Sequence, residues 1–225
     1  MKSIVIYPSY KCNLSCPYCW VRNGDFEENG HIPLERWGNA LRDLPKDCVV
    51  DIVGGEPTLL RGLYEFCSSL PHWAITTNLA LWEAWEPFCA RPLTNHEGIT
   101  CSWHEQMPKQ EFLLRLYALS KAGYHVRWSR VESLASPGIV GWEGSANVLI
   151  SKAKQVPARP CNAGMKHIVI DPKGTIYRCQ TWLMEHHCPM GNLFKDGPVH
   201  LATSELCDLS CAPCYLEGQF GVRQR

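Results

Sequence analysis

The sequence lacks an excess of charge of either sign, a long apolar segment and any low-complexity stretch. Its 225 residues carry 22 Lys and Arg against 22 Asp and Glu, which gives a formal net charge of zero. A neutral chain has no overall attraction for a phosphate backbone, so we do not expect a nucleic-acid partner. Apolar runs such as Ile4–Tyr7 are far shorter than the ~18 residues of a membrane span, and Pro8 and Cys12 follow too early for a signal peptide. We therefore expect a cytoplasmic protein without a membrane segment.

Cysteine is the residue that the chain has in excess. Its 13 cysteines are too many for chance, yet their number is odd and the chain is longer and richer in apolar residues than a disulfide scaffold. Clustered cysteines in a reducing compartment bind metal or do chemistry. Three of them lie close together near the N-terminus, and six lie in the last third: Cys161, Cys179, Cys188, Cys207, Cys211 and Cys214. The other four (Cys48, Cys67, Cys89 and Cys101) fall in strand or helix contexts and are expected to be buried apolar residues.

The first two thirds of the chain alternate between strand and helix patterns. Strands are expected at residues 3–7, 48–53, 73–76, 99–102 and 124–131, with a short sixth at 147–150. Helices are expected at residues 33–44, 58–70, 79–88 and 108–122. This order predicts a parallel α/β sheet, and five or six units fall short of an eight-fold barrel, so we expect an open or partial barrel.

The pattern changes at Pro157. A hairpin is expected from strands at 166–171 and 175–179, joined by a turn at 172–174, and the chain beyond it looks like loop. This segment is too small to build a core alone and needs a staple such as a metal cluster. We therefore divide the chain into a barrel (1–155), a small C-terminal subdomain (156–218) and a frayed tail (219–225).

Two motifs that carry chemistry follow the first two strands. Cys12, Cys16 and Cys19 lie on the loop after the first strand. A structural zinc needs four ligands, whereas a four-iron cluster held by three cysteines keeps one iron open; a zinc site with a remote fourth ligand stays an alternative. The second motif, Gly54-Gly55-Glu56-Pro57, offers close backbone approach and a carboxylate at the strand end, where open α/β sheets place ligands.

Together the two motifs resemble the radical S-adenosylmethionine (radical SAM) superfamily. Thr76-Thr77-Asn78 after the third strand and Ser102 at the end of the fourth add to the match, which covers residues 1–155. The resemblance implies an α/β fold, a partial (βα)6 barrel. It also implies an enzyme that reductively cleaves SAM to a 5′-deoxyadenosyl radical, which abstracts hydrogen from a substrate.

The resemblance assigns roles to individual residues. Cys12, Cys16 and Cys19 would ligate a [4Fe–4S] cluster whose open iron binds the methionyl group of SAM. The remaining SAM contacts would come from the Gly54-Gly55 backbone, Glu56 and Pro57 at the amino group, Tyr18 near the adenine, Asn78 and Ser102 at the ribose or carboxylate, and Arg127 at the carboxylate. His104 lies where a strand end would face the substrate, and we consider it both as a proton acceptor and as an ordinary loop histidine.

The C-terminal cysteines are similar to the SPASM/twitch extensions of this superfamily, which hold auxiliary [4Fe–4S] clusters. The spacing of Cys161, Gly174 and Cys179, followed by late cysteines, fits the shorter twitch form with one auxiliary cluster. Its expected ligands are Cys161, Cys179, Cys211 and Cys214, with Cys188 or Cys207 as replacements and a zinc site as an alternative. The segment from Cys207 to Cys214 repeats the N-terminal spacing, but no strand precedes it and no Gly-Gly-Glu follows it, so we assign it to the auxiliary site.

The substrate is expected to be a small molecule, an amino-acid-like or nucleoside-like group, or a short peptide, and the outcome oxidation, isomerisation, epimerisation or crosslinking. Flavodoxin or ferredoxin is the expected electron donor. The sequence has no room for a leader-binding domain before its first strand, which disfavours a peptide substrate. Trp103 and Trp128 are candidates for lining a substrate cavity. The alternatives are a non-catalytic zinc or iron-sulfur module, or a radical SAM protein similar to the deazaguanine synthases or the glycyl-radical activases.

Overall fold

The computed structural model describes residues 2–17, 19–23, 26, 32–130, 139–140, 148–149, 160–161, 167–184, 186, 189–196 and 205–206. Tyr18, Cys188, Cys207, Cys211, Cys214 and the predicted tail at 219–225 lie outside these residues. For Cys161 the backbone is described but the side chain is not. Among the described residues, no helix has the length and apolar character needed to cross a membrane.

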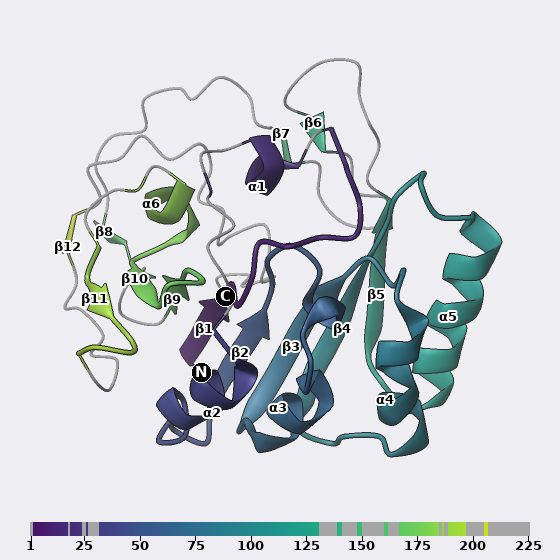
Figure 1. The fold of residues 1–225 in the computed structure, drawn as a ribbon, viewed down its shortest axis with the longest axis horizontal. Coiled ribbons are helices and arrows are strands. Elements are labelled where there is room, and N and C mark those ends of the chain that lie inside the picture. Colours follow the sequence, from purple (N-terminus) through teal and green to yellow (C-terminus); the bar gives the residue numbers. More distant parts are fainter. Residues whose placement is uncertain are drawn as a thin grey trace.

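An eight-stranded sheet forms the centre of the protein (Figure 1). Its strand order is β11-β10-β9-β1-β2-β3-β4-β5. The strands from β9 to β5 are parallel to their neighbours, and β10 and β11 are antiparallel. The strand bounds are β1 Lys2–Ile6, β2 Cys48–Ile52, β3 His72–Thr77, β4 His96–Trp103, β5 Val126–Arg130, β9 His167–Ile170, β10 Thr175–Tyr177 and β11 Gly191–Asn192. The structure confirms the predicted open, mostly parallel α/β fold.

The predicted sixth strand at 147–150 is wrong as a member of this sheet. Its counterpart, β7 (Val148–Leu149), pairs antiparallel with β6 (Ile139–Val140) in a separate two-stranded sheet. The place beside β1 belongs to β9, the first strand of the predicted hairpin, in register from Ser3↔His167 to Ile6↔Ile170. All four residues of β9 are buried, as a strand inside a parallel sheet requires, whereas β7 has only two residues. The predicted boundary at 155 falls outside the described residues and stays a prediction.

Helices cover one face of the sheet and bury the main core there (Figure 1). They are α2 (Leu34–Ala40), α3 (Leu63–Ser69), α4 (Glu86–Ala90) and α5 (Lys109–Lys121). Alternate strand residues such as Ile4, Val50 and Ile75 point into this core together with the largest fully buried side chains, which are Trp37, Trp73, Trp85, Phe88 and Phe112. Cys48, Cys67 and Cys101 are buried in it and Cys89 packs against it, which confirms their predicted apolar role.

Two predicted helices are divided in the structure. Residues 58–70 form a 3-10 turn, η1 (Pro57–Leu59), and then α3, and Gly62 lies between them in the left-handed region at φ 80°. Residues 79–88 form η2 (Trp82–Trp85) followed by α4, with Pro87 in the first turn of α4. Apolar periodicity does not distinguish one long helix from two short turns that bury the same face.

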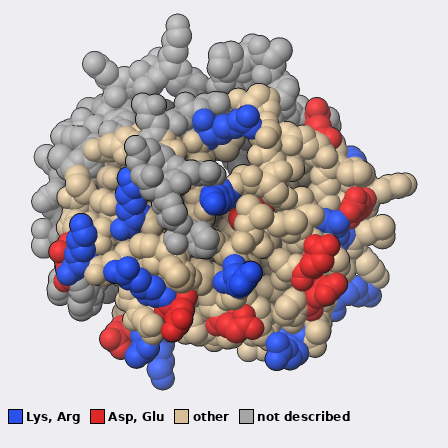
Figure 2. All heavy atoms as spheres, in the orientation of Figure 1, with Lys and Arg blue, Asp and Glu red and all other residues tan. Residues whose placement is uncertain are grey.

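The remaining described elements are short and extend the sheet region. α1 (Trp20–Asn23) follows the cysteine loop, and α6 (Gln180–Met184) follows β10 in a stretch predicted as loop. β8 (Pro160–Cys161) pairs antiparallel with β12 (Glu205–Leu206). Over the described surface, Lys and Arg are intermixed with Asp and Glu (Figure 2), so the visible face has no single-sign patch.

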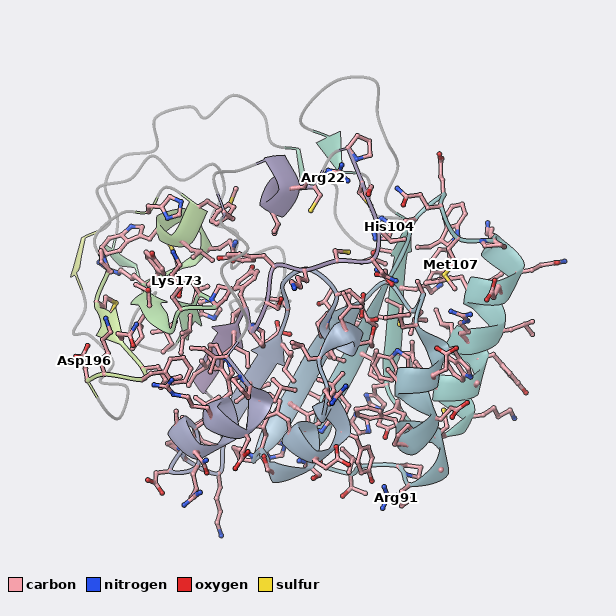
Figure 3. All side chains as sticks on the ribbon, in the orientation of Figure 1. Arg22, Arg91, His104, Met107, Lys173 and Asp196 are labelled. Carbon is pink, nitrogen blue, oxygen red and sulfur yellow. The ribbon has the colours of Figure 1, made fainter. Side chains whose placement is uncertain are left out.

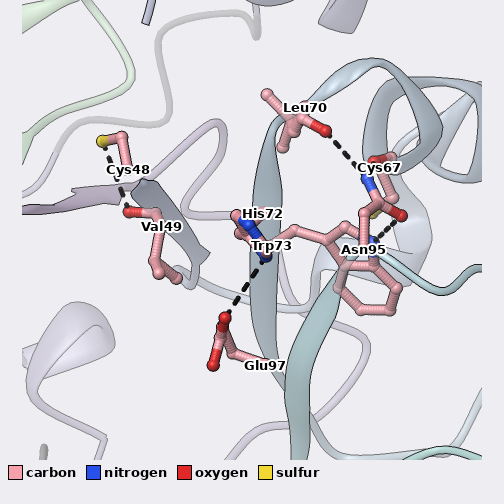
Figure 4. Close-up of polar contacts among 8 residues, drawn as sticks. All are labelled: Cys48, Val49, Cys67, Leu70, His72, Trp73, Asn95 and Glu97. Carbon is pink, nitrogen blue, oxygen red and sulfur yellow. Dashed lines mark hydrogen bonds and ion pairs between the residues drawn. The ribbon is translucent and has the colours of Figure 1, made fainter. Parts of the chain in front are cut away.

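The N-terminal edge of the strands is fixed by side-chain contacts (Figure 4). The Asn95 amide donates to the carbonyls of Cys67 (3.1 Å) and Leu70 (2.8 Å) at the end of α3. His72 and Glu97, on neighbouring strands, lie 3.3 Å apart. These contacts hold the edge opposite to the one that carries the predicted site.

The second face of the sheet is polar over strands β2 to β5, and we call it the open face. Its side chains alternate with those of the helix-covered core, as strand geometry requires. Its members are Asp51, Ala74, Thr76, Gly98, Thr100, Ser102, Arg127 and Ser129, of which Arg127 is exposed and Thr76, Thr100 and Ser102 are half-buried. A polar, partly accessible face is where a ligand of this sheet would lie.

Candidate active site

The cysteine loop after β1 lies directly against the Gly54-Gly55-Glu56 turn after β2. The amide of Gly55 donates to the Ser9 carbonyl (3.0 Å), and the amide of Glu56 donates to the Lys11 carbonyl (2.7 Å). A Cβ on Gly55 would lie 1.9 Å from the Lys11 carbonyl oxygen, and one on Gly54 would lie 2.3 Å from that of Ser9. The two glycines are therefore required by the close approach of the cysteine loop, a role that the sequence did not reveal.

The three N-terminal cysteines lie on this loop and differ in exposure. Cys16 is buried, Cys19 is half-buried and Cys12 is exposed, and the amide of Cys19 donates to the Cys16 carbonyl (3.2 Å). Burial raises the pKa of the Cys12 thiol, and the charges of Glu56, Cys16 and Cys19 raise it further. A bound metal centre would reverse this for Cys12 and hold its sulfur as a thiolate.

The donor set that the loop offers consists of three thiols. Among the described residues, no three His, Cys, Asp or Glu side chains are grouped as the ligands of a single ion. A zinc ion needs its thiolates at ~2.3 Å, and therefore close to one another. A four-iron cluster takes each cysteine at a separate iron, so its ligands stand further apart. Three thiols on one loop can supply three ligands of a four-iron cluster and leave one iron open; a zinc site with a remote fourth ligand stays the alternative.

Glu56 is almost fully buried and joins the ends of β2 and β3. Its Oε1 atom accepts from the Thr58 amide (3.1 Å), the Thr58 hydroxyl (2.7 Å) and the Thr77 hydroxyl (2.8 Å). Within the described residues, its Oε2 atom accepts only from the Asn78 amide (2.7 Å). Burial raises the pKa of this carboxyl, and the hydrogen bonds partly offset the rise. Since each carboxylate oxygen has about two acceptor sites, Oε2 keeps capacity for one more donor.

Asn78 links this carboxylate to the cysteine loop. Its side-chain amide donates to Asn13 Oδ1 (2.8 Å) and lies 3.8 Å from Cys12 Sγ, while its Oδ1 accepts from the Ala80 amide (2.8 Å). The predicted residues Glu56, Asn78 and Cys12 thus form one connected network at the C-terminal edge of the sheet.

The loop after β4 contacts the middle cysteine. His104 Nδ1 lies 3.3 Å from Cys16 Sγ, and Gln106 Nε2 lies 3.9 Å from the same atom. Gln106 Oε1 also accepts from the Ser15 amide (3.2 Å). Figure 3 shows His104 at the C-terminal edge, opposite to Arg91. His104 was predicted to face substrate, but the structure places its ring against the cysteine loop; Gln106 carried no sequence signal.

Two serines face the open side below this edge. Ser102 of β4 is in register with Ser129 of β5. Ser129 is buried, and in the described part of the chain its hydroxyl has no hydrogen-bond partner. A buried hydroxyl without a partner costs free energy, so Ser129 could donate a hydrogen bond to a ligand on this face. The sequence analysis did not identify Ser129. Its alternation with Trp128 is also the pattern of an ordinary strand that buries one face.

The two tryptophans expected near the substrate face the other way. Trp103 is buried in the helix-side core, and its indole donates to the Met107 carbonyl (2.9 Å). Trp128 packs against Phe112 of α5, with ring centroids 6.2 Å apart. The expectation that they line a substrate cavity is wrong, because alternation along β4 and β5 directs them to the helices.

Arg127 and Asp51 face each other across the open face. Arg127 lies one alternation below Ser129, and its guanidinium extends back toward Gly98, 3.8 Å from where a Cβ on that glycine would lie. Burial raises the pKa of Asp51 to about 6, and the charge of Arg127 opposes this rise. Asp51 was not predicted as a site residue. An acidic residue inside an otherwise apolar strand is the sequence feature that could have indicated it.

The raised pKa of Asp51 predicts a pH-dependent stability. The pKa of Asp51 is 3.8 in the unfolded chain and about 6 in the folded protein. The stability that the protonated carboxyl provides is therefore fully present below pH 3.8 and is lost as the pH rises through 6. We expect Asp51→Asn to exceed the wild type in stability above pH 6, by at most about 3 kcal/mol, and to lose this advantage at lower pH. Chemical unfolding at pH 5 and pH 8 measures it, with Glu97→Gln as the control. An advantage independent of pH would contradict the assignment.

The predicted auxiliary ligands are only partly within the described residues. Cys179 is buried in a second core cluster with Tyr7, Tyr177 and Trp182. The backbone of Cys161 in β8 pairs with Glu205 of β12, two residues before Cys207. The pairing therefore places the backbone of Cys161 beside residues 205–206, while Cys207, Cys211 and Cys214 lie outside the described residues.

Comparison with known proteins was made by sequence and by structure. No family model and no curated protein sequence matches the chain. Among solved structures, Streptococcus suis SuiB bound to its precursor peptide SuiA matches with a TM-score of 0.62 at 16% identity, over 87% of this chain and 63% of SuiB. BtrN in complex with AdoMet and 2-DOIA matches with a TM-score of 0.58 at 17% identity, over 87% of this chain and 79% of BtrN.

A third match is anSMEcpe with bound AdoMet and Cp18Cys peptide, with a TM-score of 0.53 at 14% identity over 86% of this chain and 77% of that protein. All three are radical SAM enzymes. The structural likeness therefore shows that the chain shares the fold of these three enzymes, as the sequence motifs predicted. The chain spans less than two thirds of the length of SuiB, and its own activity and substrate are inferences.

Proposed function

We propose that the protein is a radical SAM enzyme whose active site lies at the C-terminal edge of the sheet. The observation that carries this proposal is the three-cysteine loop held against Gly54-Gly55-Glu56 by two backbone hydrogen bonds, within the radical SAM fold. A [4Fe–4S] cluster on Cys12, Cys16 and Cys19 would supply the electron that cleaves SAM and leaves a 5′-deoxyadenosyl radical to abstract hydrogen from the substrate.

The residues of the chain would bind and orient SAM. Glu56 Oε2, which accepts a single hydrogen bond from the part of the chain that the structure describes, is suited to the SAM ammonium group. The partnerless hydroxyl of Ser129 and its neighbour Ser102 are suited to the carboxylate or the ribose. Asn78 holds the cysteine loop and Glu56 in place, and Pro57 begins the turn that gives Glu56 two of its donors. Tyr18 remains the candidate for the adenine.

We also propose one auxiliary [4Fe–4S] cluster in the C-terminal segment. The backbone pairing of Cys161 with Glu205 supports this proposal, since Glu205 precedes the late cysteines in the sequence by two residues or more. Cys179, Cys211 and Cys214 complete the proposed set, and replacement of one by Cys188 or Cys207 stays open. Four protein ligands would make this cluster an electron carrier, with flavodoxin or ferredoxin as the external donor.

The substrate class is a small molecule, an amino-acid-like group or a short peptide. SuiB and anSMEcpe are described with bound peptides and BtrN with 2-DOIA, so the fold serves both kinds of ligand. For this chain we propose oxidation, isomerisation, epimerisation or crosslinking of such a substrate, begun by hydrogen abstraction at the open face.

The decisive experiment is anaerobic reconstitution followed by reduction in the presence of SAM. We expect a brown protein with about eight irons per chain for two four-iron clusters, and formation of 5′-deoxyadenosine. A protein that binds about four irons per chain and forms 5′-deoxyadenosine would support the proposed function and contradict the auxiliary cluster. A colourless protein with stoichiometric zinc and no 5′-deoxyadenosine would support a non-catalytic zinc module instead.

The contact between His104 and Cys16 predicts a change in cluster potential. Hydrogen bonds to cysteine sulfur stabilise the reduced, more negative state of a cluster. We expect His104→Ala to make the potential of the N-terminal cluster more negative, which redox titration followed by electron paramagnetic resonance measures. Replacement of the exposed His125 is the control. An unchanged potential, with lost substrate turnover, would return His104 to the predicted role of proton acceptor.

A further inference from the structure

The open face carries two opposite charges that the proposed SAM site does not use. Asp51 lies on β2, between Val5 of β1 and Ala74 of β3 in the strand register. Within the described residues, its carboxylate has no hydrogen-bond or ion-pair partner. A half-buried carboxylate flanked by apolar neighbours is destabilising on its own, and such groups are concentrated at functional sites.

Arg127 supplies the opposite charge on the same face. In the described part of the chain, its guanidinium also lacks an ion pair or a hydrogen bond. It leans over Gly98, near the N-terminal end of β4, whereas the cysteine loop contacts the residues after the C-terminal end of β4. The side chain therefore leans toward the N-terminal end of β4, away from the cysteine loop; its predicted role at the SAM carboxylate stays a prediction.

The strip of sheet between the two charges bears almost no side chain. Asp51 is in register with Ala74, and Ala74 is in register with Gly98. Three strand spacings separate β2 from β5, roughly 14 Å between backbones, and the length of the Arg127 side chain reduces this gap without closing it to an ion pair. Of the titratable side chains near this strip, His72 and Glu97 contact each other nearer the N-terminal edge, and His125 lies beside Gly98 with its Cβ 3.7 Å from where a Cβ on that glycine would lie.

We propose that Asp51 and Arg127 bind the substrate through an amino-acid-type zwitterion, with its ammonium group at Asp51 and its carboxylate at Arg127. The proposal rests on the proposed function, because it places the substrate on the open face below SAM. Each charge then gains a charge-assisted hydrogen bond that it lacks in the protein alone. Ala74 and Gly98 leave the backbone of β3 and β4 bare for the ligand to lie across. The substrate class narrows to a free amino acid or to a molecule that carries such a group.

The test is ligand-observed binding to the reconstituted holoprotein with SAM. The probes are the free protein amino acids, followed by the N-acetyl and carboxamide derivatives of those that bind, measured by saturation-transfer NMR. We expect a subset of free amino acids to bind and each blocked derivative to bind about 10- to 100-fold more weakly. In Asp51→Asn, the free amino acid and its N-acetyl derivative should bind equally well, while the carboxamide still binds more weakly. In Arg127→Gln, the free amino acid and its carboxamide should bind equally well, while the N-acetyl derivative still binds more weakly. Glu97→Gln and Lys109→Gln are the matched controls.

Three outcomes would overturn the proposal. These are no binding of any free amino acid, equal effects of both variants on both derivatives, and weaker binding of SAM itself in Arg127→Gln, which would return Arg127 to the SAM carboxylate. The unfolding experiment on Asp51→Asn shows separately that this variant folds. Formation of 5′-deoxyadenosine by the wild type tests the proposed function independently. If the protein binds amino acids selectively but forms no 5′-deoxyadenosine, the binding site is supported and the radical SAM activity is rejected.

Discussion

Cys16→Ala is expected to remove the N-terminal cluster and to lower 5′-deoxyadenosine formation by more than about 100-fold, since loss of a group that only supports a metal ligand already costs 10- to 100-fold. Cys16 is the buried member of the three, and both His104 and Gln106 contact its sulfur. Replacing Cys16 therefore removes a proposed cluster ligand. It also removes the contact between the loop after β1 and the loop after β4. Iron content per chain and 5′-deoxyadenosine yield, measured anaerobically, are the two readouts.

Cys89→Ala is the matched control. Cys89 is half-buried, and it packs against the helix-side core away from the cysteine loop. We expect this variant to keep the iron content and the activity of the wild type. Equal activity of Cys16→Ala and the wild type would reject the assignment of the first cluster.

Gly55→Ala is expected to disrupt the site without removing any chemical group. The added Cβ would lie 1.9 Å from the carbonyl oxygen and 2.3 Å from the carbonyl carbon of Lys11, so backbone must move. We expect the free energy of unfolding to fall by about 3 kcal/mol or more, corresponding to a melting temperature lower by roughly 6–12 °C for a chain of this size. Iron binding should fall as well, because the displaced backbone carries Cys12.

The control for this substitution is Gly38→Ala in α2. A Cβ there would meet only ordinary contacts at 3.7 Å, and alanine is the better helix former. Its stability should equal or exceed that of the wild type by up to about 1 kcal/mol. A Gly55→Ala protein as stable as Gly38→Ala, with full iron content, would show that the cysteine loop does not need this close approach.

The motifs of the N-terminal half were readable in the sequence because each lies within a few residues of a strand end. Cys12, Glu56 and Asn78 follow three strands whose apolar patterns are clear, and parallel strands bring their C-terminal ends to one edge. Helix ends were less predictable. The left-handed Gly62 divides one expected helix, and nothing in the apolar period of that segment reports the division.

The identity of the strand beside β1 could not be predicted either. β7 and β9 are both short apolar segments far along the chain, and local pattern carries no record of pairing partners. The same limit applies to side chains in contact across long separations. Gln106 reaches Cys16 from 90 residues away, and Asp51 faces Arg127 only because four strands are in register.

The sequence by itself determined the parallel α/β architecture, the three-cysteine loop and the carboxylate that follows the second strand, because these depend on residue types at short spacing. The tertiary structure alone decided which strand completes the sheet, why the two glycines are required, and which charges of β2 and β5 share the open face. The physical reason is that strand pairing and side-chain direction are set by long-range packing and register, which local spacing does not encode.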